Sequence, residues 1–383
     1  MHPKLHVLYT DAVSLEILRP ILDQLPQPPQ DAHIAIKPNL VVPKPSTSGA
    51  TTDPRLVSCV IGYLQEKGHK TIKILEGSGV GDNTQRAFQT CGYDEISRTS
   101  NVPLVDLKRD KAAQVRVHDL TVEVCQEVLD SDFLINMPVL KAHCQTRLTC
   151  ALKNLKGCIP DREKRRFHTL GLHRPIAALN TIVKSDWIIV DGIIGDLTFE
   201  EGGTPIYMGK IIVGDDPVLV DTYALELLGL ELEDVPYVSM AAAWEVGTTD
   251  LANTDIVEHV HGENPPVVPQ PANPVAQRYR QFIDEREACS ACYASLIYAL
   301  RRYEQLYGAL PRDLRFAIGQ GFKPTTENHR EEISKSIDPD KAYGIGQCTA
   351  KLYPKHVSGC PPTAKEILAG LETWLQKKPR DQR

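Results

Sequence analysis

The chain has 383 residues and a formal net charge of −6, so it is long enough for more than one domain and lacks the basic balance of a general nucleic-acid binder. No run of about 18 apolar residues predicts a transmembrane helix. The first residues, MHPKLHVLYTDAV, also lack the apolar core of a signal peptide. We therefore expect a cytoplasmic protein that binds neither nucleic acid nor membrane. In that compartment its ten cysteines are not expected to form a disulfide framework.

Short apolar runs alternate with helical patterns up to about residue 250. Four runs have the length and apolar character of buried strands: 33–42, 71–78, 132–140 and 186–195. Three segments carry helix signals, such as the cap residue Asp53 before Pro54: 53–68, 82–92 and 216–230. Strands that alternate with helices predict an α/β domain with a mostly parallel sheet flanked by helices.

A proline-rich segment marks the clearest domain boundary. Residues 261–275, HGENPPVVPQPANPV, predict a stiff linker. It separates an α/β domain over 1–260 from a smaller C-terminal α/β cysteine domain over 276–383. In the second domain we expect a helix, three strands that end in loops, and a closing helix: 285–306, 314–322, 342–348, 355–360 and 362–378.

Four cysteines of the C-terminal domain form a candidate metal site: Cys289, Cys292, Cys348 and Cys360. The first two form a C-x-x-C pair. The other two follow predicted strands, and the carboxyl ends of parallel strands meet at one edge of a sheet. Four thiolates suit a 4Fe–4S cluster or a tetrahedral zinc ion. A structural zinc site more often has two C-x-x-C pairs, so this unequal spread favours the cluster. Burial as ordinary core thiols is the alternative.

Cys360 stands before two prolines, which cannot continue a strand and which we expect to start the last helix. The N-terminal dipole of that helix would favour a negative group such as an iron-bound thiolate. Residues 359–371, GCPPTAKEILAGL, resemble the Gly-Cys-Pro-Pro-then-helix segment in the small, cluster-bearing subunits of nickel–iron hydrogenases and of respiratory complex I. The resemblance implies that Cys360 ligates a 4Fe–4S cluster.

Polar residues gather at the predicted strand ends of the first domain. Loops at the carboxyl ends of an α/β sheet bind ligands, so we expect a cationic crevice for a small anionic ligand, a carboxylate or a phosphate. The expected binding residues are Lys37, Asn39, Lys153, Asn154, Lys156 and His173. The candidate catalytic residues are His143, Lys141 and Glu76. For each of these residues a solvated loop, a helix cap or a salt bridge is the alternative.

Six ordered motifs cover much of the first domain: KPNLV (37–41), ATTDPRLV (50–57), INMPVLKAH (135–143), TCALKNLKG (149–157), DGIIGDLTFEEGGTP (191–205) and GDDPVLVDTYALELLG (214–229). Together they resemble the family named Domain of Unknown Function 362, from about residue 33 to 230. The resemblance implies an α/β fold and leaves the reaction open. Many members carry a ferredoxin-like module with two clusters, but this chain has no C-x-x-C-x-x-C-x-x-x-C run.

These features favour an iron–sulfur protein with redox or cluster-assisted chemistry, of the oxidoreductase kind, on an anionic substrate or cofactor. A redox partner protein is implied if the cluster cycles electrons. Four thiolates ligate the iron fully, so electron transfer or a structural role is expected rather than substrate activation at iron. Two alternatives stay open: a non-redox enzyme with structural zinc that acts on a carboxylate or phosphate, and a metal-delivery scaffold.

Overall fold

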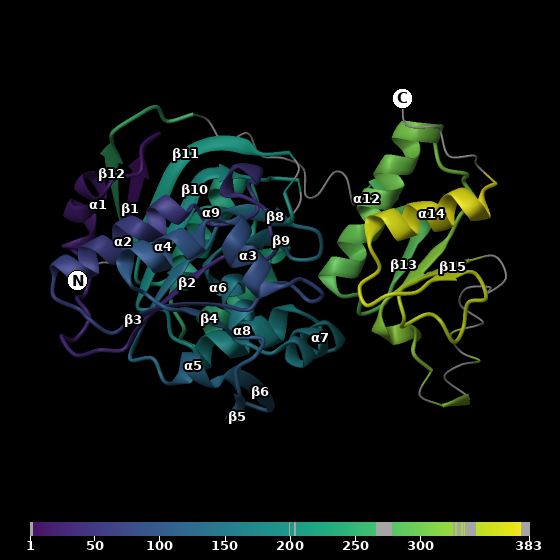
Figure 1. The fold of residues 1–383 in the computed structure, drawn as a ribbon, viewed down its shortest axis with the longest axis horizontal. Helices are drawn as coiled ribbons and strands as arrows, with labels where there is room; N and C mark the ends of the chain where they lie inside the picture. Colours follow the sequence, from purple (N-terminus) through teal and green to yellow (C-terminus); the bar gives the residue numbers. More distant parts are fainter. Residues whose placement is uncertain are drawn as a thin grey trace. The chain divides into compact units, whose positions relative to one another are not determined.

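The structure is a computed structural model. It describes residues 3–265, except Phe199 and Gly203, and residues 278–376, except 325, 328–330, 332 and 334–341. The chain divides into two compact units, Met1–Ala272 and Asn273–Arg383 (Figure 1). The predicted linker lies between the core elements of the two units, and its residues 266–275 fall outside the described residues.

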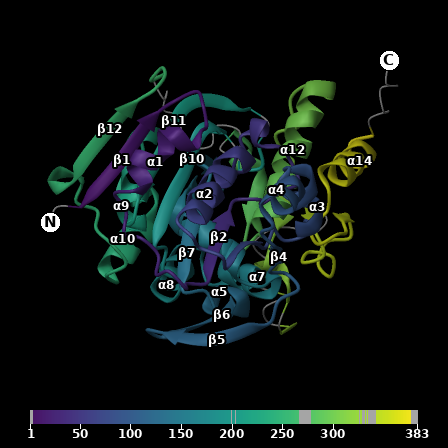
Figure 2. The same cartoon turned by 60° about the vertical axis from the view of Figure 1, so that its left-hand side comes forward.

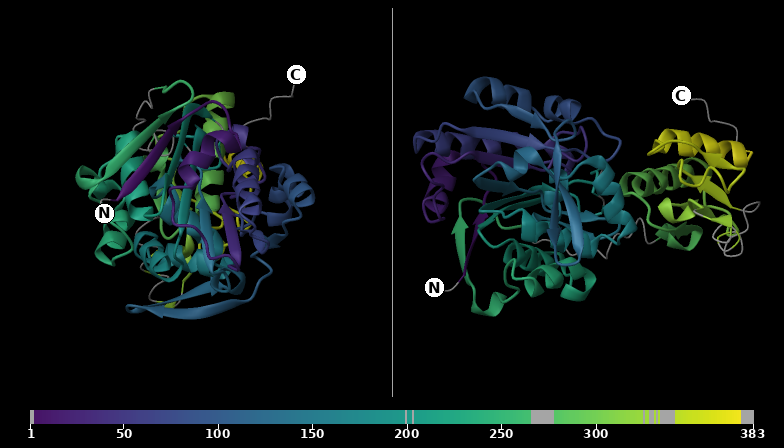
Figure 3. Two further views of the ribbon diagram at one scale, coloured as in Figure 1. Left: turned by 90° about the vertical axis from the view of Figure 1, so that its left-hand side faces the viewer. Right: turned by 90° about the horizontal axis from the view of Figure 1, so that it is seen from below.

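The first unit is built on an eight-stranded sheet with helices on both faces (Figures 1 and 3). In spatial order its strands are β12 (Asp255–Val260), β1 (Lys4–Tyr9), β11 (Ile206–Gly214), β10 (Trp187–Gly195), β7 (Phe133–Met137), β2 (Ile34–Pro38), β3 (Ile72–Glu76) and β4 (Leu104–Asp106). Only β11 is antiparallel to its neighbours in this sheet. The predicted α/β class with a mostly parallel sheet is therefore confirmed.

Two hydrophobic clusters cover the two faces of this sheet. Helices α1 (Leu15–Leu22), α2 (Pro54–Glu66), α3 (Thr84–Thr90) and α4 (Tyr93–Ser100) supply the cluster on one face (Figure 2). The other face is covered mainly by α6 (Ala151–Asn154), α7 (Asp161–Thr169), α8 (His173–Ile182), α9 (Pro217–Leu228) and α10 (Pro236–Ala243). Along β10, Trp187 and Ile189 join the first cluster, whereas Ile188 and Val190 join the second. This alternation explains why the buried strands read as continuous apolar runs.

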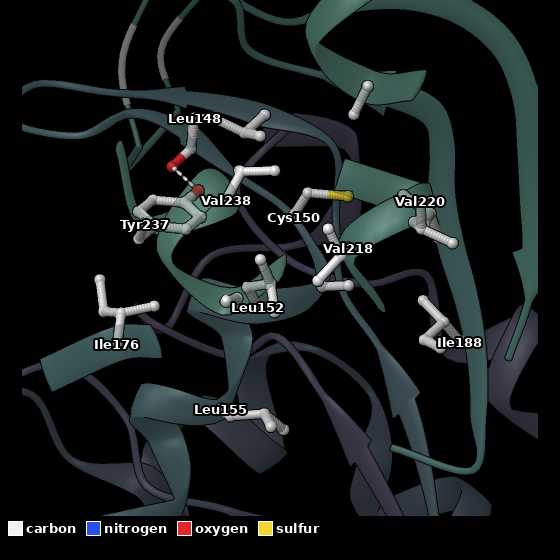
Figure 4. Close-up of a cluster of buried hydrophobic side chains, with 14 of the residues drawn as sticks. Leu148, Cys150, Leu152, Leu155, Ile176, Ile188, Val218, Val220, Tyr237 and Val238 are labelled. Atoms are coloured by element: carbon white, nitrogen blue, oxygen red, sulfur yellow. Dashed lines mark hydrogen bonds between the residues drawn. The ribbon is translucent and has the colours of Figure 1, made fainter. Parts of the chain in front are cut away.

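The start of the short helix α6 is anchored in the second of these clusters (Figure 4). The Tyr237 hydroxyl donates a hydrogen bond to the backbone oxygen of Leu148 at 3.2 Å. Figure 4 also shows this packing around Cys150, Leu152, Leu155, Ile188, Val218 and Val220. Helix α6 begins directly after Cys150, so this core sets the position of the polar residues that α6 carries.

The predicted helices of the first unit are present, and their ends have the expected chemistry. The side chain of Asp53 accepts from the Arg55 N–H at the start of α2, with Pro54 in the first turn. Asp216 caps α9 in the same way, and Gly229 ends that helix with φ 61°. Sequence analysis missed several elements of this unit. Among them are β1, β4, β11, β12, the hairpin of β5 (Ala112–Val117) and β6 (Leu120–Cys125), and the helices α1, α4, α5 (Gln126–Leu129), α8 and α10.

The second unit has a four-stranded sheet whose pairings are all parallel. Its strands are β13 (Ile283–Glu285), β14 (Phe316–Ile318), β15 (Tyr343–Ile345) and β16 (His356–Val357), with helices α12 (Ser290–Tyr307) and α14 (Ala364–Trp374) packed against each other. The three predicted strands are present. Strand β13 was not predicted, because its residues were assigned to the start of the following helix or left unassigned.

The last helix, α14, begins after Pro361 and Pro362 and includes neither of them. Its cap is Thr363, whose hydroxyl accepts from the Glu366 N–H at 3.2 Å, while the Glu366 carboxylate accepts from the Thr363 N–H at 2.7 Å. The expectation that Pro361 and Pro362 start this helix is therefore wrong: they precede a capping box that satisfies the first turn internally. No helix in the described part of the chain is both long enough and apolar enough to cross a membrane.

Candidate functional site

A buried ion pair joins the ends of the neighbouring strands β2 and β3. Lys37 Nζ lies 2.9 Å from Glu76 Oε2, and the two side chains are 1% and 3% exposed. The Glu76 carboxylate also accepts the backbone N–H groups of Leu40 and Gly77, both at 2.7 Å. Each charge is thus compensated inside the protein, an arrangement that favours a structural role for the pair. Proton transfer by Glu76 stays a prediction.

Asn154 links this ion pair to strand β7. Its Nδ2 donates to Asn136 Oδ1 at 2.8 Å and to the backbone oxygen of Lys37 at 3.2 Å. Gly157 packs directly against the ion pair: a Cβ at position 157 would lie 2.3 Å from Glu76 Oε1 and 2.5 Å from Lys37 Cε. Lys37 and Asn154, both expected to bind a ligand, are therefore hydrogen-bonded to protein groups.

Lys141 lies on the hairpin formed by β8 (Lys141–His143) and β9 (Arg147–Thr149), where it is directly opposite Thr149. Its side chain is buried, and Nζ donates to Asn39 Oδ1 at 3.3 Å and to the backbone oxygen of Ala50. Burial, followed by the neighbouring Lys153 cation, lowers the pKa of Lys141 to about 7. A lysine in this range exchanges protons near neutral pH, as general acid–base catalysis requires.

His143 is held by the turn that follows it. The backbone N–H groups of Gln145 and Thr146 donate to its Nδ1 at 3.1 and 3.2 Å. Since Nδ1 accepts, the neutral ring carries its proton on Nε2, which lies 3.7 Å from Glu200 Oε1. Burial, followed by the Lys153 cation, holds the pKa of His143 well below its usual value, so the ring is neutral at physiological pH.

Cys144 and Glu200 complete this group. The Cys144 thiol donates to Glu200 Oε1 at 2.8 Å, and its backbone N–H donates to Oε2 at 3.0 Å. Burial, followed by the charge of Glu200, raises the pKa of the Cys144 thiol far above its usual value. One ligand-type atom from each of His143, Cys144 and Glu200 lies within 4.8 Å of the other two, so the three side chains could hold a metal ion.

Sequence analysis did not select Cys144 or Glu200. A signal was available, because Cys144 directly follows a candidate histidine and Glu200 belongs to an acidic pair within one of the six motifs. The two residues are 56 positions apart, however, and only the fold brings them together.

Lys153, on α6, adds a half-buried cation to the same region. Its Nζ donates to Thr149 Oγ1 at 3.3 Å, and no carboxylate of the described residues forms an ion pair with it. Burial lowers the pKa of Lys153 to about 8, against the opposing effect of the Glu200 charge. We call Lys141, His143, Cys144, Lys153 and Glu200 the hairpin cluster.

Of two other residues predicted to bind the ligand, Lys156 lies near the hairpin cluster and His173 belongs to a different environment. Lys156 Nζ lies 3.4 Å from His168 Nε2, and the Lys156 cation also lowers the pKa of His143, after burial and Lys153. His173 begins α8 instead, and its ring stacks on Tyr237 with a centroid distance of 5.8 Å. No described residue of the hairpin cluster forms a hydrogen bond with His173, which does not support a shared binding role.

The ion pair and the hairpin cluster both lie in a region shared with other proteins. The family described as Domain of unknown function (DUF362) matches residues 34–226. The chain belongs to the DUF362 family. The resemblance carried by the six motifs is therefore confirmed, while the description of the family assigns no reaction.

Two individual proteins show how far the similarity to this DUF362 protein extends. Thylakoid-associated protein sll1697 of Synechocystis sp. is 24% identical over 231 residues, which cover 57% of this chain and 70% of the relative. The lactate racemase apoprotein from Thermoanaerobacterium thermosaccharolyticum matches in structure with a TM-score of 0.40 and 11% identity. That match covers 58% of this chain and 57% of the racemase, less than two thirds of its length.

The four predicted cysteine ligands lie outside the residues matched by DUF362. Cys289 is the cap residue of α12 and Cys292 lies in its first turn, after strand β13. Cys348 follows strand β15, and Cys360 follows strand β16. Because these strands are parallel, the segments that carry the four cysteines all leave the same edge of the sheet.

The loops that bear these cysteines also contact one another. The Gln347 N–H donates to the backbone oxygen of Gly359 at 2.8 Å, which joins the segments before Cys348 and Cys360. A Cβ on Gly346 would lie 3.7 Å from Cys292 Sγ and 3.6 Å from the Gly359 oxygen. The missing side chain at Gly346 thus leaves room beside the Cys292 thiol. Four thiols are chemically suited to a cluster or zinc. Among the described residues, however, only His143, Cys144 and Glu200 bring three ligand-type atoms within 4.8 Å of one another, so the metal centre at the four cysteines stays a prediction.

Proposed function

We propose that this DUF362 protein carries one 4Fe–4S cluster in its second unit, bound by Cys289, Cys292, Cys348 and Cys360. The single observation that carries the proposal is the position of Cys292 Sγ beside Gly346, in a loop hydrogen-bonded to the segment of Gly359. Thiolates are the usual ligands of such clusters. With every iron ligated by cysteine, the cluster would transfer electrons or stabilise its unit rather than bind a substrate.

A cluster accounts for the ligand spread better than zinc does. One C-x-x-C pair lies at the start of α12, and the other two ligands come from separate strand-end loops. Structural zinc sites more often combine two such pairs. Cys289 is buried while Cys360 is exposed, so the proposed cluster would have one side toward solvent, as electron exchange with a redox partner requires.

The first unit would bind a small anion at the hairpin cluster. Lys153 supports this proposal, because its ammonium is half-buried and has a hydroxyl partner but no ion-pairing carboxylate among the described residues. A carboxylate or phosphate would complete its electrostatic environment. Lys141, whose pKa is lowered to about 7, would then stand beside the anion as a proton-transfer group. The function that follows is redox or cluster-assisted chemistry on an anionic substrate or cofactor.

Metal analysis after oxygen-free purification tests the cluster. We expect a brown protein with about four iron and four sulfide per chain. A colourless protein that contains zinc and no sulfide would overturn the proposal and favour the non-redox enzyme with structural zinc.

A pair of variants locates the iron. Cys360→Ser removes one proposed ligand at an exposed position, so packing is little disturbed and the iron content should fall. Cys59→Ser, on α2 of the other unit, is the matched control and should retain wild-type iron. Equal iron in both variants would exclude Cys360 as a ligand.

A further inference from the structure

The first unit contains a second set of metal-ligand atoms that shares no residue with the four cysteines. Cys144 follows β8 directly, while Glu200 comes from the segment after β10. The Cys144 Sγ–Glu200 Oε1 distance is 2.8 Å and the His143 Nε2–Glu200 Oε1 distance is 3.7 Å. One nitrogen, one sulfur and one oxygen therefore converge within 4.8 Å.

The local backbone holds these atoms in place. The Cys144 N–H donates to Glu200 Oε2, which ties the carboxylate to the hairpin and turns Oε1 toward the thiol. Two backbone N–H groups on Nδ1 fix the ring plane of His143, so Nε2 is the nitrogen that faces Glu200. His143 and Glu200 are 2% and 4% exposed, so burial restricts the movement of both side chains beside the Cys144 thiol.

We propose that His143, Cys144 and Glu200 bind one divalent transition metal in the first unit, independently of the proposed cluster. Thiolate, imidazole and carboxylate together suit borderline metals such as Zn²⁺, Co²⁺, Ni²⁺ or Fe²⁺ rather than Mg²⁺ or Ca²⁺. Three protein ligands also leave a position open for water or substrate, as in catalytic zinc sites. The ion would lie in the hairpin cluster beside Lys153, where both positive charges attract the same anionic ligand.

The hydrogen bonds of His143 make it the weakest of the three ligands. A metal-bound histidine normally donates from its other ring nitrogen to an acceptor, and that donation strengthens the ligand. Here Nδ1 accepts two N–H groups instead. A metal on Nε2 requires the ring proton to move to Nδ1, and these two hydrogen bonds would then be lost. Cys144 and Glu200 therefore carry most of the affinity.

Cobalt titration of the full chain, with its iron content recorded, tests the site. Bound zinc is first removed with a chelator, and Co²⁺ uptake is followed by equilibrium dialysis and by the near-ultraviolet thiolate-to-Co²⁺ charge-transfer band. We expect about one Co²⁺ per chain in this site with that band present. Cys144→Ala should abolish the band, Glu200→Gln should weaken binding by roughly 100-fold, and His143→Gln by only about tenfold.

Controls separate this site from the proposed cluster. Cys59→Ser should bind Co²⁺ as the wild type does, and Cys144→Ala should keep wild-type iron in the second unit. Urea denaturation followed by tryptophan fluorescence shows whether the first unit of Cys144→Ala is folded. The four cysteines of the second unit could bind Co²⁺ themselves if they hold no cluster. In that case Cys360→Ser should lose the Co²⁺ of the second unit and keep the Co²⁺ bound by His143, Cys144 and Glu200, whereas Cys144→Ala should show the opposite loss. If Cys144→Ala does not fold, Glu200→Gln, with a side chain of equal size, decides the question. Equal Co²⁺ uptake by wild type and a folded Cys144 or Glu200 variant would overturn the proposal.

Discussion

Lys37 and Glu76 form an ion pair across two neighbouring parallel strands, at 2.9 Å and with almost no exposure of either side chain. Glu76 is the last residue of β3 and Lys37 the second-last of β2, so the pair lies at the sheet edge where α/β proteins bind ligands. The carboxylate accepts two backbone N–H groups in addition to the ammonium, which offsets the cost of removing both charges from water.

Removal of one partner of this pair should be strongly destabilising. Glu76→Gln leaves the Lys37 ammonium buried without its counter-charge, and we expect a loss of roughly 3–5 kcal/mol in the free energy of unfolding. Urea denaturation followed by tryptophan fluorescence measures this, and Lys37→Met/Glu76→Gln should lose less than the two single changes together. Glu95→Gln breaks an exposed pair with Arg98 and should cost at most about 1 kcal/mol. Similar losses for Glu76 and Glu95 would contradict the structural role of the buried pair.

Gly157→Ala tests the close packing over the same ion pair. The added methyl group would lie 2.3 Å from Glu76 Oε1, so either the pair or the segment after α6 must move. We expect a loss of roughly 1–3 kcal/mol in stability. Gly62→Ala on α2 is the matched control, since its nearest atom would be 3.6 Å away and alanine favours a helix by up to about 1 kcal/mol. A Gly157→Ala variant as stable as the wild type would show that the ion pair is not closely covered.

Lys153 is expected to dominate anion binding in the first unit. Lys153→Gln removes a half-buried charge while keeping a polar side chain, so affinity for inorganic phosphate or a small carboxylate should fall by about tenfold or more, because charge-assisted hydrogen bonds are among the strong ones. Isothermal titration calorimetry at low salt measures the change. Lys184→Gln removes a charge from a side chain that is 86% exposed and should leave affinity unaltered. Equal losses in the two variants would indicate a general surface attraction.

Asp221 should give the protein a pH-dependent stability. It lies on α9, is fully buried, and accepts the N–H groups of Ala151 and Leu152 at 2.7 and 3.2 Å. Burial raises the pKa of Asp221 to about 7, above its ordinary value of 3.8. Between these two values the folded state holds a proton that the unfolded state has released, so this residue's contribution to stability falls as pH rises, by roughly 1.4 kcal/mol per pH unit.

Asp221→Asn isolates this contribution, because asparagine cannot ionise. The stability difference between wild type and Asp221→Asn should shift in favour of the variant by roughly 3 kcal/mol between about pH 5 and pH 7. Urea denaturation at a series of pH values measures it, and the subtraction cancels other groups that titrate in the same range. Parallel pH profiles for the two proteins would contradict the raised pKa.

Local patterns predicted the central part of the fold well. Strands β2, β3, β7 and β10 are buried on both faces, so each leaves a short continuous apolar run in the sequence. Strand β11 escaped prediction although it is largely buried, because nothing local separates it from the preceding loop or shows that it runs antiparallel to β10. Strand β13 has three residues, too few for any periodicity.

The sequence by itself determined which residue types stand at the strand ends, the dispersed set of four cysteines, and the six motifs of the DUF362 family. Only the tertiary structure decided their partners. It brings Lys37 to Glu76, 39 positions away, and Cys144 to Glu200, 56 positions away. The Lys37 ammonium therefore forms a buried ion pair, and the Cys144 thiol donates a hydrogen bond to the Glu200 carboxylate. The physical reason is that partners depend on strand order and on the path of the loops, which the packing of the whole sheet sets and local periodicity does not encode.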